Sequence, residues 1–67
     1  MYPRDHQLLE DLKRAFGTYP FSLQLGRWWG DNGGTLARLN GDEESLERLV
    51  SAGMVRKLDD GARYSVV

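Results

Sequence analysis

The chain has 67 residues, of which 40% are hydrophobic and 28% are charged. This composition is typical of one small globular domain and excludes disordered, collagen-like and coiled-coil proteins. Because a domain of this size buries only about 60% of the surface that its unfolded chain exposes, we do not expect a deep substrate cavity.

Cysteine is absent from the sequence, which excludes disulfides, cysteine-ligated zinc and thiol chemistry. No stretch approaches the roughly 20 apolar residues of a membrane span, and no signal-peptide pattern is present. We therefore expect a single domain over residues 1–67 that is cytoplasmic and does not contact a membrane.

Acidic and basic residues nearly balance, with nine Lys and Arg against ten Asp and Glu. Sequence-independent nucleic-acid binding depends on the neutralisation of phosphates, which favours a strongly basic domain. Any DNA affinity of this chain must therefore come from a local cluster of cations that the net charge of −1 conceals.

The first predicted element is an amphipathic helix from Asp5 to Phe16. Its apolar residues recur at spacings of three and four, and charged residues occupy the other side. We expect Asp5 to cap the N-terminus of this helix and Gly17 to end it in the left-handed conformation.

The segment from residue 18 to residue 34 carries conflicting patterns. Ser22 can cap a short helix that runs through Trp29, whereas the apolar residues between Phe21 and Leu25 alternate as they do in a strand. We favour the helix here, followed by a glycine-rich turn over residues 30–34.

Two further helical segments and a hairpin complete the prediction. Residues 35–39 are expected to form one or two helical turns, and Asp42 is expected to cap a helix that ends at Gly53. The stretches 54–58 and 62–67 read as the two strands of a hairpin.

The predicted hairpin loop has three residues, Asp59, Asp60 and Gly61. This register places Lys57 directly opposite Arg63, and such a like-charge pair costs stability unless an anion neutralises it. That anion is either external, as a phosphate or a carboxylate of a partner would be, or supplied by Asp59 and Asp60.

The stretch from Thr35 to Lys57 resembles the helix-turn-helix and first wing strand of winged-helix domains. The residues that carry the resemblance are Leu46, Leu49, Ala52, Gly53, Met54 and Val55. It implies an α+β, winged-helix-like fold with three helical segments and a C-terminal β-hairpin wing. We expect the core to contain Leu9, Leu12, Phe16, Leu36, Leu46, Leu49, Val50 and Tyr64.

The resemblance also implies a DNA-binding or transcription-regulating role. The base-reading and wing positions of the family correspond to Arg48, Ser51 and Arg63, and we expect Arg38 and Lys57 to contact phosphates as well. Because one short module supplies few contacts, we expect double-stranded DNA to be bound by a homodimer.

A second hypothesis is a protein-interaction domain without DNA binding. The outward face of the helix after residue 42 carries three glutamates, at positions 43, 44 and 47, which repel phosphates, and under this hypothesis the acidic face binds a partner protein or a second copy of the chain. Neighbouring helix positions cannot both point inward, so either Trp28 or Trp29 is exposed beside Arg27 as a partner contact. The alternative is that both indoles wrap around the core.

No catalytic constellation is present in the sequence. His6 is the only histidine, and none of the four serines has a base or a nucleophile elbow around it. We therefore expect no enzyme activity, no metal ion and no cofactor.

Overall fold

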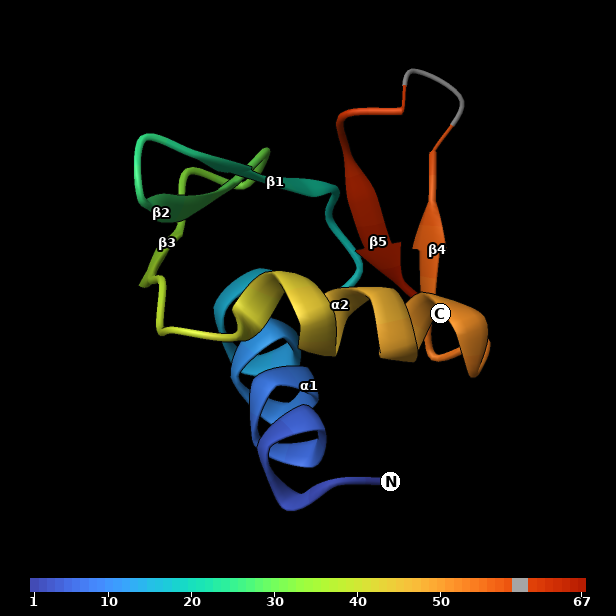
Figure 1. Cartoon of the computed structure of the whole chain (residues 1–67). Coiled ribbons are helices and arrows are strands. Elements are labelled where there is room, and N and C mark those ends of the chain that lie inside the picture. Colours follow the sequence, from blue (N-terminus) through green and yellow to red (C-terminus); the bar gives the residue numbers. More distant parts are fainter. Residues whose placement is uncertain (59–60) are drawn as a thin grey trace.

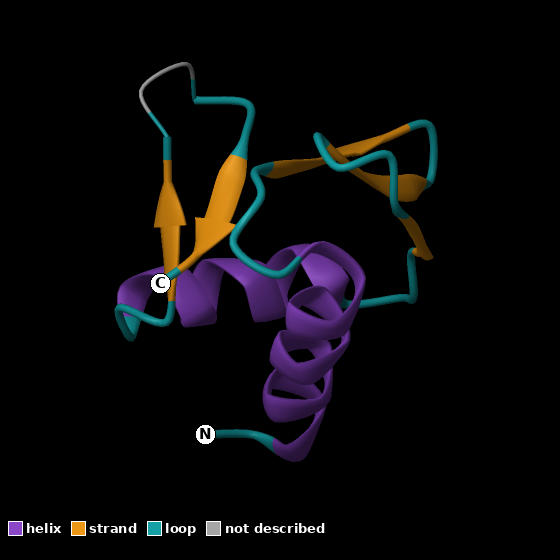
Figure 2. Cartoon of the chain, turned by 180° about the vertical axis from the view of Figure 1, so that it is seen from behind, coloured by secondary structure: helices purple, strands orange, loops and turns teal. Residues whose placement is uncertain are grey.

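The computed structural model describes residues 1–58 and 61–67 and has two helices and one five-stranded antiparallel sheet (Figure 1). The elements in chain order are α1 (Pro3–Phe16), β1 (Phe21–Gln24), β2 (Arg27–Gly30), β3 (Thr35–Ala37), α2 (Asp42–Ser51), β4 (Val55–Lys57) and β5 (Tyr64–Val66). The strands lie in the order β3-β2-β1-β5-β4, and the two helices lie beneath them (Figure 2).

The winged-helix-like architecture expected from the sequence is therefore wrong, since the fold is α+β but has neither three helical segments nor a separate hairpin wing. Residues 22–29 and 35–39, expected to be helical, form strands and their turns. Short apolar runs fit helix and strand periods equally well. Here β2 pairs with β1 on one side and with β3 on the other, and these ladders supply more hydrogen bonds than isolated helical turns can.

Both helices form, but their N-terminal caps differ from the prediction. Helix α1 begins at Pro3 and has Tyr2 at the N-cap, so the predicted cap at Asp5 is wrong. Helix α2 begins at Asp42 and has Gly41, with φ of 88°, at the N-cap. The predicted end of α1 at Gly17 is confirmed, because Gly17 donates its N–H to the Lys13 carbonyl; its φ of 58° is positive, but its ψ of −123° lies outside the left-handed helical region that was predicted.

The C-terminal hairpin forms with a register that differs by one residue from the prediction. Lys57 lies opposite Tyr64, and Val55 lies opposite Val66. The predicted opposition of Lys57 and Arg63 is therefore wrong, and with it the reason to place an anion between them. A shift of one residue exchanges the faces of a strand, which turns Val55 toward the core and leaves Arg56 exposed. The predicted loop residues Asp59 and Asp60 lie outside the described residues.

In the described part of the chain, strand pairing joins the two halves of the sheet through one residue pair. Strand β1 pairs with β2 over four residue pairs, but it pairs with β5 only through Phe21 and Tyr64. Beyond this pair the two strands diverge (Figure 1).

The core lies between the helices and the sheet. The predicted core residues Leu9, Leu12, Phe16, Leu46 and Leu49 are all buried, while Leu36, Val50 and Tyr64 pack against them and are partly buried. Residues from the strands complete the cluster, and these are Phe21, Trp28, Val55 and Val66.

Trp28 links the sheet to α2. Its side chain is fully buried, and its indole N–H donates to Asp42 Oδ2 at 3.0 Å. The same carboxylate oxygen accepts the Leu39 backbone N–H at 2.9 Å. Asp42 therefore fixes the start of α2 by binding groups that precede it in the chain.

Replacing Trp28 with Phe removes one donor from a buried carboxylate and leaves a void. We expect the free energy of unfolding to fall by about 2–4 kcal/mol. Trp29→Phe is the matched control, because the Trp29 side chain is 42% exposed, and its expected loss is below about 1 kcal/mol. Urea denaturation followed by circular dichroism measures both, and equal losses would contradict the role of the Trp28–Asp42 bond.

Candidate functional site

Arg48, the predicted base-reading residue, is bound by the first helix. Its Nε and Nη2 atoms donate to the two carboxylate oxygens of Asp5 at 2.7 and 2.9 Å. The guanidinium also lies 4.8 Å from the centroid of the Tyr2 ring. This arrangement joins α1 to α2 and neutralises the charge that was expected to contact DNA.

The Asp5 carboxylate is well suited to hold this arginine, because its side chain is only 3% exposed. The hydrogen bonds from Arg48 lower the pKa of Asp5 from 3.8 to about 2, although burial acts in the opposite direction. The same pairing raises the pKa of Arg48. Both groups therefore stay ionised at neutral pH.

Two more of the predicted phosphate contacts are also paired within the chain. Arg38 Nη2 lies 2.6 Å from Glu43 Oε1, and Arg63 Nη1 lies 2.8 Å from Asp31 Oδ2. Exposed ion pairs of this kind contribute little to stability. Each one nevertheless places a carboxylate beside the cation, where it repels a phosphate.

Ser51 and Lys57 are the predicted DNA contacts that the structure does bring together. Both are exposed, and both line a hollow of about 290 Å³ with Leu46, Glu47, Val50 and Tyr64. We refer to this surface as the second hollow, because a larger concave surface is described below. Its walls combine apolar residues with one acidic and one basic side chain, which is not the basic surface that DNA binding requires.

The predicted partner-contact residues lie on both faces of β2. Trp28 is buried and belongs to the core, whereas Trp29 is half-exposed and donates its indole N–H to the Gln24 carbonyl at 2.9 Å. One indole is thus inside and the other is not, because successive residues of a strand alternate between its faces. Arg27 is exposed and donates to Thr35 Oγ1 at 3.1 Å.

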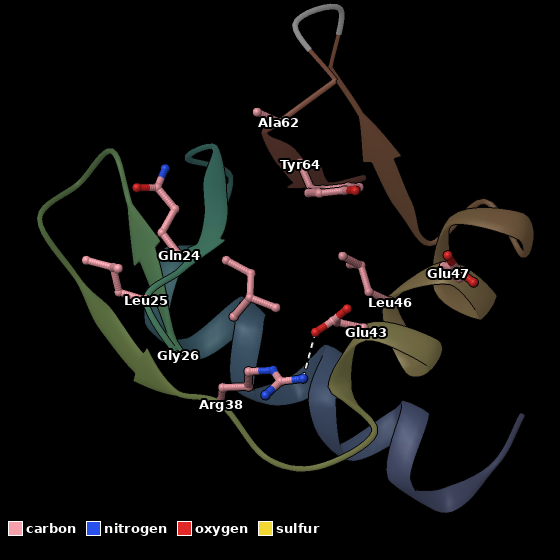
Figure 3. A pocket seen from close by; sticks show the side chains of 10 residues that line it. Gln24, Leu25, Gly26, Arg38, Glu43, Leu46, Glu47, Ala62 and Tyr64 are labelled. Carbon is pink, nitrogen blue, oxygen red and sulfur yellow. Dashed lines mark hydrogen bonds and ion pairs between the residues drawn. The ribbon is translucent and has the colours of Figure 1, made fainter.

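A larger concave surface opens where β1 and β5 diverge. Figure 3 shows its two walls, β1 with the following turn on one side and the segment through Ala62 and Tyr64 on the other, with α2 as the floor. Its volume is about 530 Å³. We name this surface the inter-strand groove, and its lining residues are Leu23, Gln24, Leu25, Gly26, Arg38, Glu43, Leu46, Glu47, Ala62 and Tyr64.

The floor of the inter-strand groove is apolar at its centre and charged on both sides. Leu46 points from α2 into the groove, with Tyr64 above it (Figure 3). Arg38 and Glu43 lie on one side of Leu46 and form the ion pair described above, while Glu47 lies on the other side (Figure 3). Leu46, Glu47 and Tyr64 also line the second hollow, so the two concave surfaces are continuous.

The mouth of the groove is formed by a strained turn. Leu25 and Gly26 connect β1 to β2, and their φ angles are 52° and 74°. Two positive φ values are typical of the type I′ hairpin turn, which favours Asn or Gly at the first of these positions. A leucine there costs about 1–2 kcal/mol, and Leu25 recovers none of this by burial, because its side chain is 95% exposed.

The sequence prediction named Arg38 and the acidic face of α2 but missed the apolar residues of this groove and the grouping of all these residues into one site. Leu23, Leu25, Glu47 and Tyr64 come from three separate parts of the chain and are brought together only by the sheet. One signal was available, because a Leu-Gly pair between two stretches that fit strands takes the place of the usual Asn-Gly turn.

The described residues offer no metal centre or membrane segment. In residues 1–58 and 61–67, no group of three or more His, Asp and Glu side chains could hold a metal ion. Among these same residues, no helix combines the length and the apolarity that a membrane crossing requires. His6 lies on the exposed surface of α1, 3.9 Å from Glu10.

No protein-family model matches this chain, and no significant match is found among curated proteins or solved structures. Its function is therefore inferred from its own surfaces.

The Asp5–Arg48 pair makes stability depend on acid pH. Because the pKa of Asp5 in the folded chain, about 2, is below its ordinary value of 3.8, the stabilisation is complete above the ordinary value and is lost as the pH falls toward about 2. We expect the melting temperature to drop over this range, and Asp5→Asn to flatten the drop and to lower stability at neutral pH.

Asp11→Asn is the matched control for this measurement. Asp11 also pairs with an arginine, Arg14, but on the solvent side of α1, where the Arg14 side chain is 74% exposed. This variant should retain the acid dependence of the unsubstituted chain in thermal melts. If Asp5→Asn retains it equally, the assigned role of Asp5 is incorrect.

Proposed function

We propose that this chain is a protein-binding module that recognises its partner through the inter-strand groove. The observation that carries the proposal is the distribution of charge and apolar surface. Arg38, Arg48 and Arg63 are engaged in ion pairs within the chain, whereas the groove presents Leu23, Leu46 and Tyr64 in a concave surface.

The size and composition of the groove support this proposal. Its volume of about 530 Å³ lies within the range of about 300–1,000 Å³ that is usual for small-molecule sites, which gives room for a few side chains of a protein partner. Apolar and polar surface share the lining of this groove about equally, and Glu43, Arg38 and Glu47 are the charged groups that can fix the orientation of a bound partner.

Leu25 supports the same location. A residue that is strained and also exposed gives the fold no benefit, and such residues concentrate at functional sites. Leu25 lines the groove, and its exposed side chain, which points away from Leu46 and Tyr64 in Figure 3, adds apolar surface to the rim, where burial of a leucine side chain by a partner contributes about 1.5–3 kcal/mol.

DNA binding remains a prediction from the sequence, and a salt titration decides between the two functions. We expect a fluorescent DNA duplex to show no change in anisotropy with this chain even at low ionic strength. The variant Glu43→Gln is the positive control, because it removes the carboxylate paired with Arg38 and should gain weak, salt-sensitive affinity. Binding of DNA by the unsubstituted chain, with a steep loss on added salt, would contradict the proposal.

The Leu25→Asn variant separates binding from folding. Asn tolerates positive φ, so we expect the free energy of unfolding to rise by about 0.5–1 kcal/mol. The same change should weaken binding by about tenfold or more, because it removes the apolar contact at the mouth of the groove.

The binding partner in this experiment is a peptide pool selected from a random display library against the unsubstituted chain. Affinity is measured by isothermal titration calorimetry, and stability is measured by urea denaturation. A stabilised Leu25→Asn variant that binds the selected peptides as tightly as the unsubstituted chain would contradict the assignment of the site.

A further inference from the structure

We propose, building on the protein-binding function above, that the occupant of the inter-strand groove is an extended peptide that adds a strand to β1. The peptide carries an apolar side chain that packs between Leu23, Leu46 and Tyr64. It carries Lys or Arg two residues from this side chain, facing Glu47.

The first step concerns the backbone of β1. Peptide groups of successive residues in an antiparallel strand point alternately to its two neighbours. The Asp31 N–H donates to the Pro20 carbonyl, whereas the Gly30 N–H donates to the Gly34 carbonyl on the β3 side, both at 2.9 Å. Because the Pro20 carbonyl faces β2, the backbone groups of Ser22, two residues later, face β2 as well. The N–H and C=O of Leu23 therefore face the opposite side, which is the groove.

The edge at Leu23 is not used by the sheet itself. Within residues 1–58 and 61–67, strand β1 pairs with β5 only through Phe21 and Tyr64. A peptide laid along β1 at this point can exchange two hydrogen bonds with Leu23, as partners do when they extend a sheet. A helical segment could not form these bonds, because its backbone groups are already paired.

The second step concerns the side chains of the added strand. Leu23 lies opposite Trp28 and therefore on the same face of the sheet, which is the face turned toward the helices. Alternate side chains of a strand beside β1 point to this face as well. They reach the floor of the groove, where Leu46 and Tyr64 are apolar (Figure 3).

The third step concerns charge. Glu43 is neutralised by Arg38 at 2.6 Å. In contrast, no cation among the described residues lies within 4.0 Å of the Glu47 carboxylate, and Lys57, which lines the second hollow with it, forms no ion pair with it. Glu47 also lines the second hollow, and it lies on the other side of Leu46 from Arg38 (Figure 3).

These positions define a sequence pattern for the partner. Side chains that share one face of a strand are two residues apart, or roughly 6.5–7 Å. An apolar residue over Leu46 followed at this spacing by Lys or Arg places the cation beside Glu47. A charge-assisted hydrogen bond of this kind is stronger than a neutral one.

The test is a selection of random linear peptides of about eight residues, which is longer than a typical strand, on the immobilised full chain. We expect the enriched peptides to share the apolar-x-basic pattern. Methylation of single peptide nitrogens should weaken binding by about tenfold or more at every second position, because only alternate N–H groups face β1. Calorimetry gives these affinities.

Substitutions at Glu47 test the charge assignment. Glu47→Gln should weaken the binding of the selected peptides by about threefold to tenfold. In a selection on Glu47→Lys, the residue two positions from the apolar side chain should change from basic to acidic. Glu44→Gln is the matched control, since Glu44 is an exposed residue of the same helix outside the groove, and it should bind as the unsubstituted chain does. Circular dichroism confirms that each variant is folded.

The possible results of these experiments distinguish a failure of the strand-addition inference from a failure of the proposed function. Enriched peptides that lose affinity in Leu25→Asn but lack the basic residue, or show no alternation on methylation, would overturn the strand-addition inference and leave the groove as the binding site. A library that yields no binder, or binders insensitive to Leu25→Asn and Glu47→Gln, would overturn the proposed function itself.

Discussion

Among the described residues, strand pairing joins the two halves of the sheet through one residue pair, Phe21 opposite Tyr64. Hydrogen bonding at one pair is a weak connection, and the packing of aromatic rings strengthens it. The Phe21 ring lies 5.2 Å from that of Phe16, 5.7 Å from that of Trp28 and 6.3 Å from that of Tyr64. Because β1 and β5 pair only at Phe21 and Tyr64 among the described residues, the two strands diverge immediately beyond this pair, and the groove lies between them.

The ion pairs of the chain determine what remains available to a partner. Asp5 and Arg48 join the two helices, Glu43 holds Arg38 beside the start of α2, and Asp31 holds Arg63 near the hairpin. In a chain with nearly equal numbers of acidic and basic residues, such pairing removes the cations on which DNA binding would depend. It leaves the Glu47 carboxylate without a cation among the described residues, beside an apolar floor.

The parts of the fold that could be predicted from the sequence are those with a long apolar repeat or with a glycine that ends a helix. The spacing of apolar residues predicts the buried faces of α1 and α2 and most of the apolar core. Gly17 marks the end of α1. The region from Phe21 to Ala37 could not be assigned, because runs of three or four residues fit both periods and the decision comes from pairing between strands. The hairpin register depends on its turn, and an error of one residue there misplaced Lys57 relative to Arg63.

The candidate site was less predictable than the fold. Leu23, Glu47 and Tyr64 lie far apart in the chain, and their proximity depends on the sheet order β3-β2-β1-β5-β4. Arg48 and Arg63 were expected to bind DNA by their position in a resembling motif, which does not reveal their acidic partners. For Arg48 that partner, Asp5, lies 43 residues earlier in the chain.

Hydrogen exchange at the backbone amide of Leu23 tests most directly whether β1 has an open edge that a strand can occupy. The account predicts that this amide exchanges rapidly in the free chain, while the amides of Ser22 and Gln24, which face β2, are protected. Binding of a selected peptide should then protect Leu23. Strong protection of Leu23 in the free chain, or no gain of protection in the complex, would contradict the account.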